Sequence, residues 1–190
     1  MPGNFSCVLI GIASILFDKL WIEAYNIQCY KDKLRARRNA FVPEGWVAMI
    51  IAVIDGMGGG LGAQVVTQLT AQLGEKAEVI ALGTNALATN NMVRAGAARG
   101  ATGENAVRVS LRKADIVVGP IGIVIPNAMM GEITPQIAEL VASADAGKIL
   151  IPVNQNHFSI VGLEAKPLVN QIREAVARVT EIVKEKEGKS

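Results

Sequence analysis

The feature that most constrains this chain is an apolar run that breaks into a cluster of glycines. Residues 50–54 are apolar, Asp55 follows, and five of the next seven residues are glycine. Apolar residues then recur at helical spacing, as Leu61, Val65, Leu69 and Leu73. The pattern predicts a buried strand, a tight loop and an amphipathic helix in direct succession.

Such a loop suits an anionic ligand, because glycine permits positive φ and close approach of the backbone, and the following helix directs its partial positive charge to the same place. Residues 58–63 also fit the pattern G-x-G-x-x-G/A. The alternative is that the glycines only let the helix pack closely on the sheet. The predicted binding residues in the loop are Gly56, Gly58, Gly59, Gly60 and Gly62.

The rest of the chain alternates short β-branched runs with helical patterns, which is typical of βαβ units and a parallel sheet. We therefore predict an α/β fold, a three-layer Rossmann-like open sheet, mostly parallel, with four to five strands. The expected strands are 50–54, 78–82, 115–118, 148–153 and a short one at 158–161. The expected helices are 60–74, 85–99, 102–113, 134–144 and one that carries Leu168, Ile172, Val176, Val179 and Val183 on one face.

The first 48 residues differ from the rest in composition, since they hold both cysteines and seven of the eight aromatic residues. We expect a Rossmann-like domain at 49–190, and an N-terminal extension at 1–48 that is extraneous or poorly ordered, from a misassigned start. A membrane or export role for this extension is the competing explanation. Its apolar run, 7–17, is shorter than the roughly 20 residues that span a bilayer.

The formal net charge of +2 is too small to indicate nucleic acid or an anionic membrane as a partner. A basic run at 31–38 could contact phosphates or lipid head groups, but such runs are commonly solvated. Because the main body lacks cysteine, no disulfide framework is expected and a reducing compartment is favoured. We expect a cytoplasmic protein with no nucleic-acid or membrane partner. Whether it forms a homo-oligomer is left open.

The loops that follow the strands should share one rim of the sheet, because ligands of open parallel sheets bind beyond the carboxyl ends of the strands. These loops are 55–60, 83–85, 119–122 and 154–157. A P-loop NTPase is disfavoured, because no Gly-Lys-Ser/Thr follows the glycines.

The cofactor is left open between a nucleotide and NAD(P). Dinucleotide-binding folds place an acidic residue near the end of the second strand, and residues 82–85 contain none. Thr84 and Asn85 could instead bind a ribose or phosphate, although Thr84 could equally be a helix N-cap. Arg94 could meet a 2′-phosphate only if its helix turned it inward.

Asp55 and His157 are the candidate catalytic residues, and each has a plainer explanation. Asp55 could contact Mg²⁺ or a substrate hydroxyl, act as a general base, or cap backbone N–H groups of the loop. His157, the only histidine, could act as an acid or base, or be an ordinary loop residue. Glu104 and Asn105 could also face the rim, although the helix dipole already explains a carboxylate there. No metal-ligand spacing is present, so no metal site is predicted.

Three segments resemble a bacterial family known only as domain of unknown function 3842. They are 54–62, 81–86 and 119–122, and the resemblance covers about residues 49–185. It implies no reaction and no catalytic residue, since the family has no assigned activity.

The sequence therefore predicts a protein that binds a nucleotide or another phosphorylated small molecule at the glycine-rich loop. Whether it is an enzyme stays open. The alternative is a non-catalytic sensor or regulatory module, in which binding alters an oligomer contact through the apolar loop 121–130.

Overall fold

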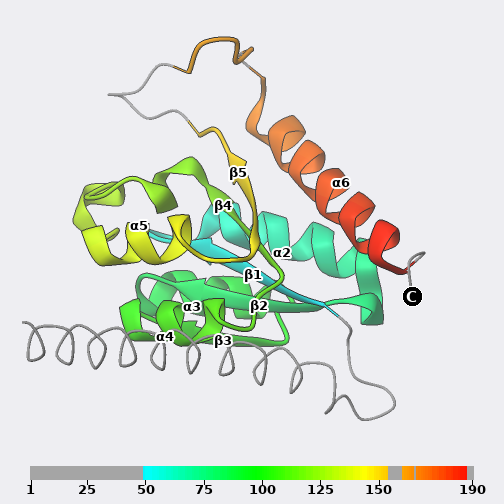
Figure 1. The fold of residues 1–190 in the computed structure, drawn as a ribbon, viewed down its shortest axis with the longest axis horizontal. Coiled ribbons are helices and arrows are strands. Elements are labelled where there is room, and N and C mark those ends of the chain that lie inside the picture. The colour runs from blue at the N-terminus through cyan, green and yellow to red at the C-terminus, as the bar shows by residue number, and fades with distance from the viewer. Residues whose placement is uncertain (1–48, 154–159, 165, 188–190) are drawn as a thin grey trace, which may run out of the picture. The chain divides into compact units, whose positions relative to one another are not determined.

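A computed structural model describes residues 49–153, 160–164 and 166–187, and within them five parallel strands form one sheet in the order β3-β2-β1-β4-β5 (Figure 1). Because β1 has β2 on one side and β4 on the other, the strand order reverses beside β1. The strands are β1 (Ile50–Asp55), β2 (Glu78–Gly83), β3 (Arg99–Thr102), β4 (Ile116–Pro120) and β5 (Gly147–Ile151).

Helices cover both faces of the sheet, as the near-continuous apolar strands require. In β1, Ile51 and Val53 face a core shared with three helices, and Ala52 and Ile54 face a second core shared with two. The first core is formed with α2 (Gly60–Leu73), α3 (Ala86–Arg94) and α6 (Leu168–Glu187). The second is formed with α4 (Glu104–Leu111) and α5 (Pro135–Ala142). The predicted α/β open-sheet class is thus confirmed.

Short 3₁₀ turns complete the connections, at η1 (Gly74–Lys76), η2 (Ile121–Val124) and η3 (Met129–Gly131). Helix α5 begins as the sequence predicts: Thr134 accepts a hydrogen bond from the Ile137 amide at 3.0 Å, and Pro135 occupies the first helical position. No helix in the described ranges is both long enough and apolar enough to cross a membrane.

The expected helix 85–99 is wrong in its second half. Helix α3 ends at Arg94, Gly96 turns the chain with a φ of +112°, and Arg99–Thr102 forms β3 along the edge of β2. The alanine-rich sequence favours a helix locally, but pairing with β2 overrides that preference. Gly100 makes the pairing compatible with α3, since a Cβ there would lie 2.5 Å from the Val93 side chain.

The short strand expected at 158–161 is wrong for the residues that are described, because Ile160 is not in a strand and Val161 begins a turn. Residues 158 and 159 lie outside the described ranges. The fifth strand of the sheet is therefore β3, which lies before β4 in the chain.

Candidate functional site

An open cleft of about 470 Å³ lies beside the carboxyl ends of β1 and β4, where the strand order reverses. The glycine-rich loop, residues 55–61, forms one wall, and Pro120, Met129 and Val153 complete the lining. In open parallel sheets this switch point is where ligands bind, because two loops diverge there and leave a crevice. The loops expected to share a rim after β1 and β4 do meet here.

Asp55 closes the base of the glycine-rich loop. Its buried carboxylate accepts hydrogen bonds from the Gly56 amide at 2.8 Å and the Gly62 amide at 2.7 Å. Burial raises the pKa of Asp55 above its ordinary value, although these amides oppose the shift. Of the three roles considered for Asp55, the geometry shows the capping of loop amides, which ties β1 to the first turn of α2.

Three of the five glycines are required by packing. A Cβ at Gly62 would lie 2.5 Å from the Met92 sulfur, and one at Gly59 would lie 2.6 Å from the Ala88 Cα. Gly59 also has a φ of +66°, which disfavours other residues. A Cβ at Gly56 would lie within 2.8 Å of side chains from two neighbouring loops. Close packing therefore explains these three positions without any ligand.

Gly58 and Gly60 are different, because a Cβ at either position would meet nothing within 4 Å. Both residues are exposed and line the cleft, and within the described residues neither amide makes a hydrogen bond. Their peptide groups are nevertheless fixed in orientation. The Met57 carbonyl accepts from the Asn85 side chain at 2.9 Å, and the Gly59 carbonyl accepts from the Ala63 amide at 2.9 Å. Since a trans peptide points its N–H opposite to its C=O, two oriented donors remain at the loop surface.

Glu132 joins the loops that follow β1 and β2, and the sequence interpretation did not identify it. Its Oε2 accepts hydrogen bonds from the Met57 amide at 2.7 Å, from Asn85 Nδ2 at 2.9 Å and from the Thr84 hydroxyl. These bonds, the one from Thr84 most strongly, lower the pKa of the Glu132 carboxyl. Glu132 is therefore ionised at neutral pH and holds three rim segments together.

The available signal for Glu132 was its isolation, because it is the only charged residue between Asp115 and Glu139. The same contacts assign roles to the two polar residues after β2. Asn85 is the N-cap of α3, since its Oδ1 accepts from the Ala88 amide at 2.9 Å. Thr84 is not the N-cap, because its hydroxyl donates to Glu132.

The loop that carries Glu132 is conformationally strained. Asn127, Met129 and Met130 have φ of +63°, +55° and +58°, in the left-handed region that residues other than glycine seldom adopt. Met129 lines the cleft, whereas Met130 is 93 % exposed. This part of the predicted apolar loop 121–130 thus reaches from the cleft to the surface.

Of the remaining candidates, Arg94 and Glu104 lie away from the cleft. His157 and its neighbours 154–156 are outside the described residues. Arg94 is exposed and does not line the cleft. Glu104 pairs with Arg108 at 3.4 Å and accepts from the Thr134 hydroxyl at 2.8 Å, rather than from the glycine-rich loop. Within the described ranges no three acidic, cysteine or histidine side chains gather as a metal site would require.

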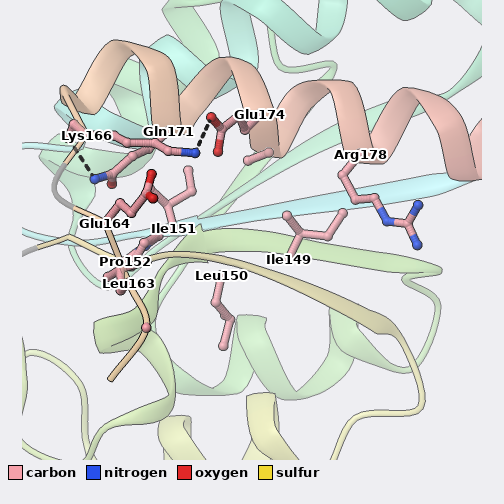
Figure 2. A pocket seen from close by; sticks show the side chains of 12 residues that line it. Ile149, Leu150, Ile151, Pro152, Leu163, Glu164, Lys166, Gln171, Glu174 and Arg178 are labelled. Atoms are coloured by element: carbon pink, nitrogen blue, oxygen red, sulfur yellow. Dashed lines mark hydrogen bonds and ion pairs between the residues drawn. The ribbon is translucent and has the colours of Figure 1, made fainter. Parts of the chain in front are cut away.

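A second cavity, of about 380 Å³, lies between β5 and α6 (Figure 2). Lys166 and Glu174 form an ion pair of 2.9 Å beside it, and Gln171 donates to the Lys166 carbonyl at 2.9 Å. The buried Oε1 of Gln171 has no hydrogen-bond partner in the described part of the chain. None of the predicted site residues that the structure describes lines this cavity, which lies at the edge of the sheet, away from the switch point.

Comparison with known families identifies residues 50–184 with the family described as "Domain of unknown function (DUF3842)". The chain belongs to this family. The resemblance seen in the sequence is thus confirmed, over almost the range expected. No match was found among curated proteins.

Among solved structures, this DUF3842 chain is similar to a dodecameric FMN-dependent Ubix-like decarboxylase from Escherichia coli O157:H7. The identity is 14 %, the TM-score is 0.36, and the alignment covers 70 % of this chain and 92 % of the other. A similarity this distant says nothing about the ligand or the assembly of the present chain.

Proposed function

We propose that this protein binds a nucleotide or another phosphorylated small molecule in the cleft beside β1 and β4, with a phosphate against Gly58 and Gly60. One observation carries the proposal. Of the five glycines, only these two have no packing reason to be glycine, and they are the two whose free amides line the cleft. A bare backbone with oriented N–H groups at the start of a helix suits a phosphate oxygen.

The charges around the loop narrow the kind of phosphate. Asp55 and Glu132 place carboxylates on the amides of residues 56, 57 and 62, and no lysine or arginine is among the described residues that line the cleft. The ionised Glu132 carboxylate would repel a dianionic phosphate monoester. A phosphodiester or a diphosphate bridge carries about one charge per phosphate and fits this loop better.

A thermal-shift panel on the full chain tests the proposal with nucleoside mono- and diphosphates, dinucleotides and sugar phosphates. A ligand at about 100 times its Kd should stabilise the protein by about 2.7 kcal/mol. The double variant Gly58→Val/Gly60→Val should lose this stabilisation, because the new side chains would fill the approach to the amides. Without ligand, the thermal unfolding midpoint of this variant should stay close to that of the wild type, since both positions have open space.

Gly147→Val is the matched control, because this glycine begins β5 and an added Cβ makes only an ordinary 3.8 Å contact there. It should retain the ligand response. Equal ligand shifts in the wild type and in the double variant would exclude the loop as the binding site.

A ligand-sensing or regulatory module is the second candidate, favoured by the strained loop that joins the cleft at Met129 to the exposed Met130. In such a module, ligand binding would change an oligomer contact through this loop. Light scattering with and without the ligand distinguishes it from an enzyme, together with a test for turnover. For a sensor, the molar mass of the oligomer should change when the ligand binds, and the ligand should not be converted.

A further inference from the structure

A carboxylate lies at the end of β2, although the sequence around this point contains none. Dinucleotide-binding sheets place an acidic side chain at this position, where it binds the hydroxyls of a ribose. Here Glu132 reaches the position from the loop that follows β4, and it is held by Thr84 and Asn85, the two residues directly after β2.

The bonding of Glu132 leaves one oxygen available. All three of its hydrogen bonds end on Oε2, and Oε1 makes none within the described residues. An ionised carboxylate only accepts hydrogen bonds, so the free oxygen suits an O–H or N–H donor of a ligand. The three donors also fix the orientation of the carboxylate, so that less side-chain entropy is lost when a ligand binds to it.

The position of Glu132 relative to the phosphate site fits a ribose. Glu132 binds the amide of Met57, and Gly58 is the next residue, so the two sites are adjacent along the loop. In a nucleotide, the ribose 3′-hydroxyl and the 5′-phosphate are likewise on one sugar unit, separated by C3′, C4′ and C5′. Asn127, Met129 and Met130, which have left-handed backbone conformations, lie shortly before Glu132 in the chain, and such strain is typical of ligand clamps.

We infer that Glu132 accepts hydrogen bonds from the ribose hydroxyls of a nucleotide whose phosphate lies against Gly58 and Gly60. This rests on the proposed function and narrows its ligand from any phosphorylated small molecule to a ribonucleotide. Glu132 then takes the part that an acidic residue of the second strand has in dinucleotide-binding folds, from a segment about 50 residues further along the chain.

Ligand pairs that differ only in the ribose hydroxyls test the inference. The full chain is titrated calorimetrically with ADP and 2′,3′-dideoxy-ADP, and with the two corresponding guanosine compounds. At least one ribonucleotide should bind about tenfold or more tightly than its dideoxy partner, because a lost hydrogen bond to a charged group costs about that much. In Glu132→Gln this ratio should fall to about one.

Glu104→Gln is the control variant, since Glu104 is a half-exposed carboxylate bonded to the Thr134 hydroxyl and not to the glycine-rich loop. It should keep the wild-type ratio. Far-UV circular dichroism and the unfolding midpoint verify that both variants fold. If Glu132→Gln does not fold, the wild-type ratio decides alone, because equal binding of the ribo and dideoxy forms overturns the inference.

The remaining outcomes separate the inference from the proposed function. A ratio that persists in folded Glu132→Gln overturns the inference. Binding of pyrophosphate or sugar phosphates but of no nucleotide, with loss in Gly58→Val/Gly60→Val, overturns the inference and leaves the proposed function standing. No binding of any phosphate compound overturns both.

Discussion

Replacing Asp55 with asparagine changes the charge and one hydrogen-bonding atom at the base of the glycine-rich loop. The carboxylate accepts from two amides, those of Gly56 and Gly62, on different oxygens. An asparagine side chain offers only one oxygen, so its NH₂ group would face the other amide. A buried donor without a partner costs about 1–3 kcal/mol of the free energy of unfolding, which is the expected loss at acid pH.

The loss should depend on pH in a defined direction. Burial raises the pKa of Asp55 in the folded state above the ordinary value of 3.8, so the folded protein binds this proton more tightly than the unfolded chain does. The contribution of Asp55 to stability is then fully present below about 3.8 and decreases as the pH rises through the folded pKa. Asparagine does not titrate, so the stability difference between wild type and Asp55→Asn should shrink as the pH rises above 3.8 and through the folded pKa.

Urea unfolding of both proteins at several pH values from 4 to 8 measures this difference, and subtraction cancels most of the other titrating groups. Each midpoint and slope gives the free energy of unfolding in water. A difference that grows with pH would refute the reasoning, because it would mean that the loop amides stabilise the charged carboxylate by more than burial destabilises it. A wild-type-like variant at every pH would show that the two hydrogen bonds contribute nothing to stability.

Two further predictions concern stability alone. Gly62→Ala should lower the free energy of unfolding by about 1–3 kcal/mol, because the new methyl group overlaps Met92, whereas Gly60→Ala should be neutral or slightly stabilising. Urea unfolding of the two variants measures this contrast. Equal stability changes would contradict the conclusion that packing requires glycine at position 62 but not at position 60. Thr134→Ala should lower the free energy of unfolding by about 1 kcal/mol, because the Ile137 amide loses its hydrogen-bond acceptor. Thr134→Ser keeps the hydroxyl and should retain most of this stability. An equal loss in both variants would show that the hydroxyl is not the cause.

The succession of β1, the glycine-rich loop and α2 could be predicted from the sequence almost to the residue, because each local signal favours the same structure. The apolar run, the glycines and the helical spacing all agree, and β1 and α2 begin where they indicate. The same holds for α5, where Thr134 and Pro135 fix the start by local chemistry. Such segments can be predicted from the sequence because neighbouring local signals agree.

Strand β3 could not be predicted in this way, because its sequence carries no strand signal. Arg99–Thr102 is an edge strand with little buried apolar surface, so neither alternation nor a run of β-branched residues marks it. What places it is hydrogen bonding to β2, an interaction with residues about 20 positions earlier. Local propensity is a weak guide wherever tertiary pairing decides the structure.

The candidate site was predictable only in part, for the same reason. The glycine loop, Thr84 and Asn85 follow strands that the sequence reveals, so their gathering on one rim follows from a parallel sheet. Glu132 contacts Met57 from 75 residues away, and no regular element aims it there. Only its position as a lone charge in an uncharged stretch marked it in the sequence.

The sorting of the five glycines bears on how such motifs are interpreted in general. The motif predicts a phosphate loop from a count and a spacing, yet three of the five positions are explained by packing and by the backbone. The two carboxylates provide a more direct argument, because Asp55 and Glu132 show that amides of this loop already bind negative oxygen at 2.7–2.8 Å. Gly58 and Gly60 continue the same row of donors into the cleft. A ligand oxygen there would join a loop built for anions, beside the ionised Glu132 carboxylate, which selects against a doubly charged phosphate.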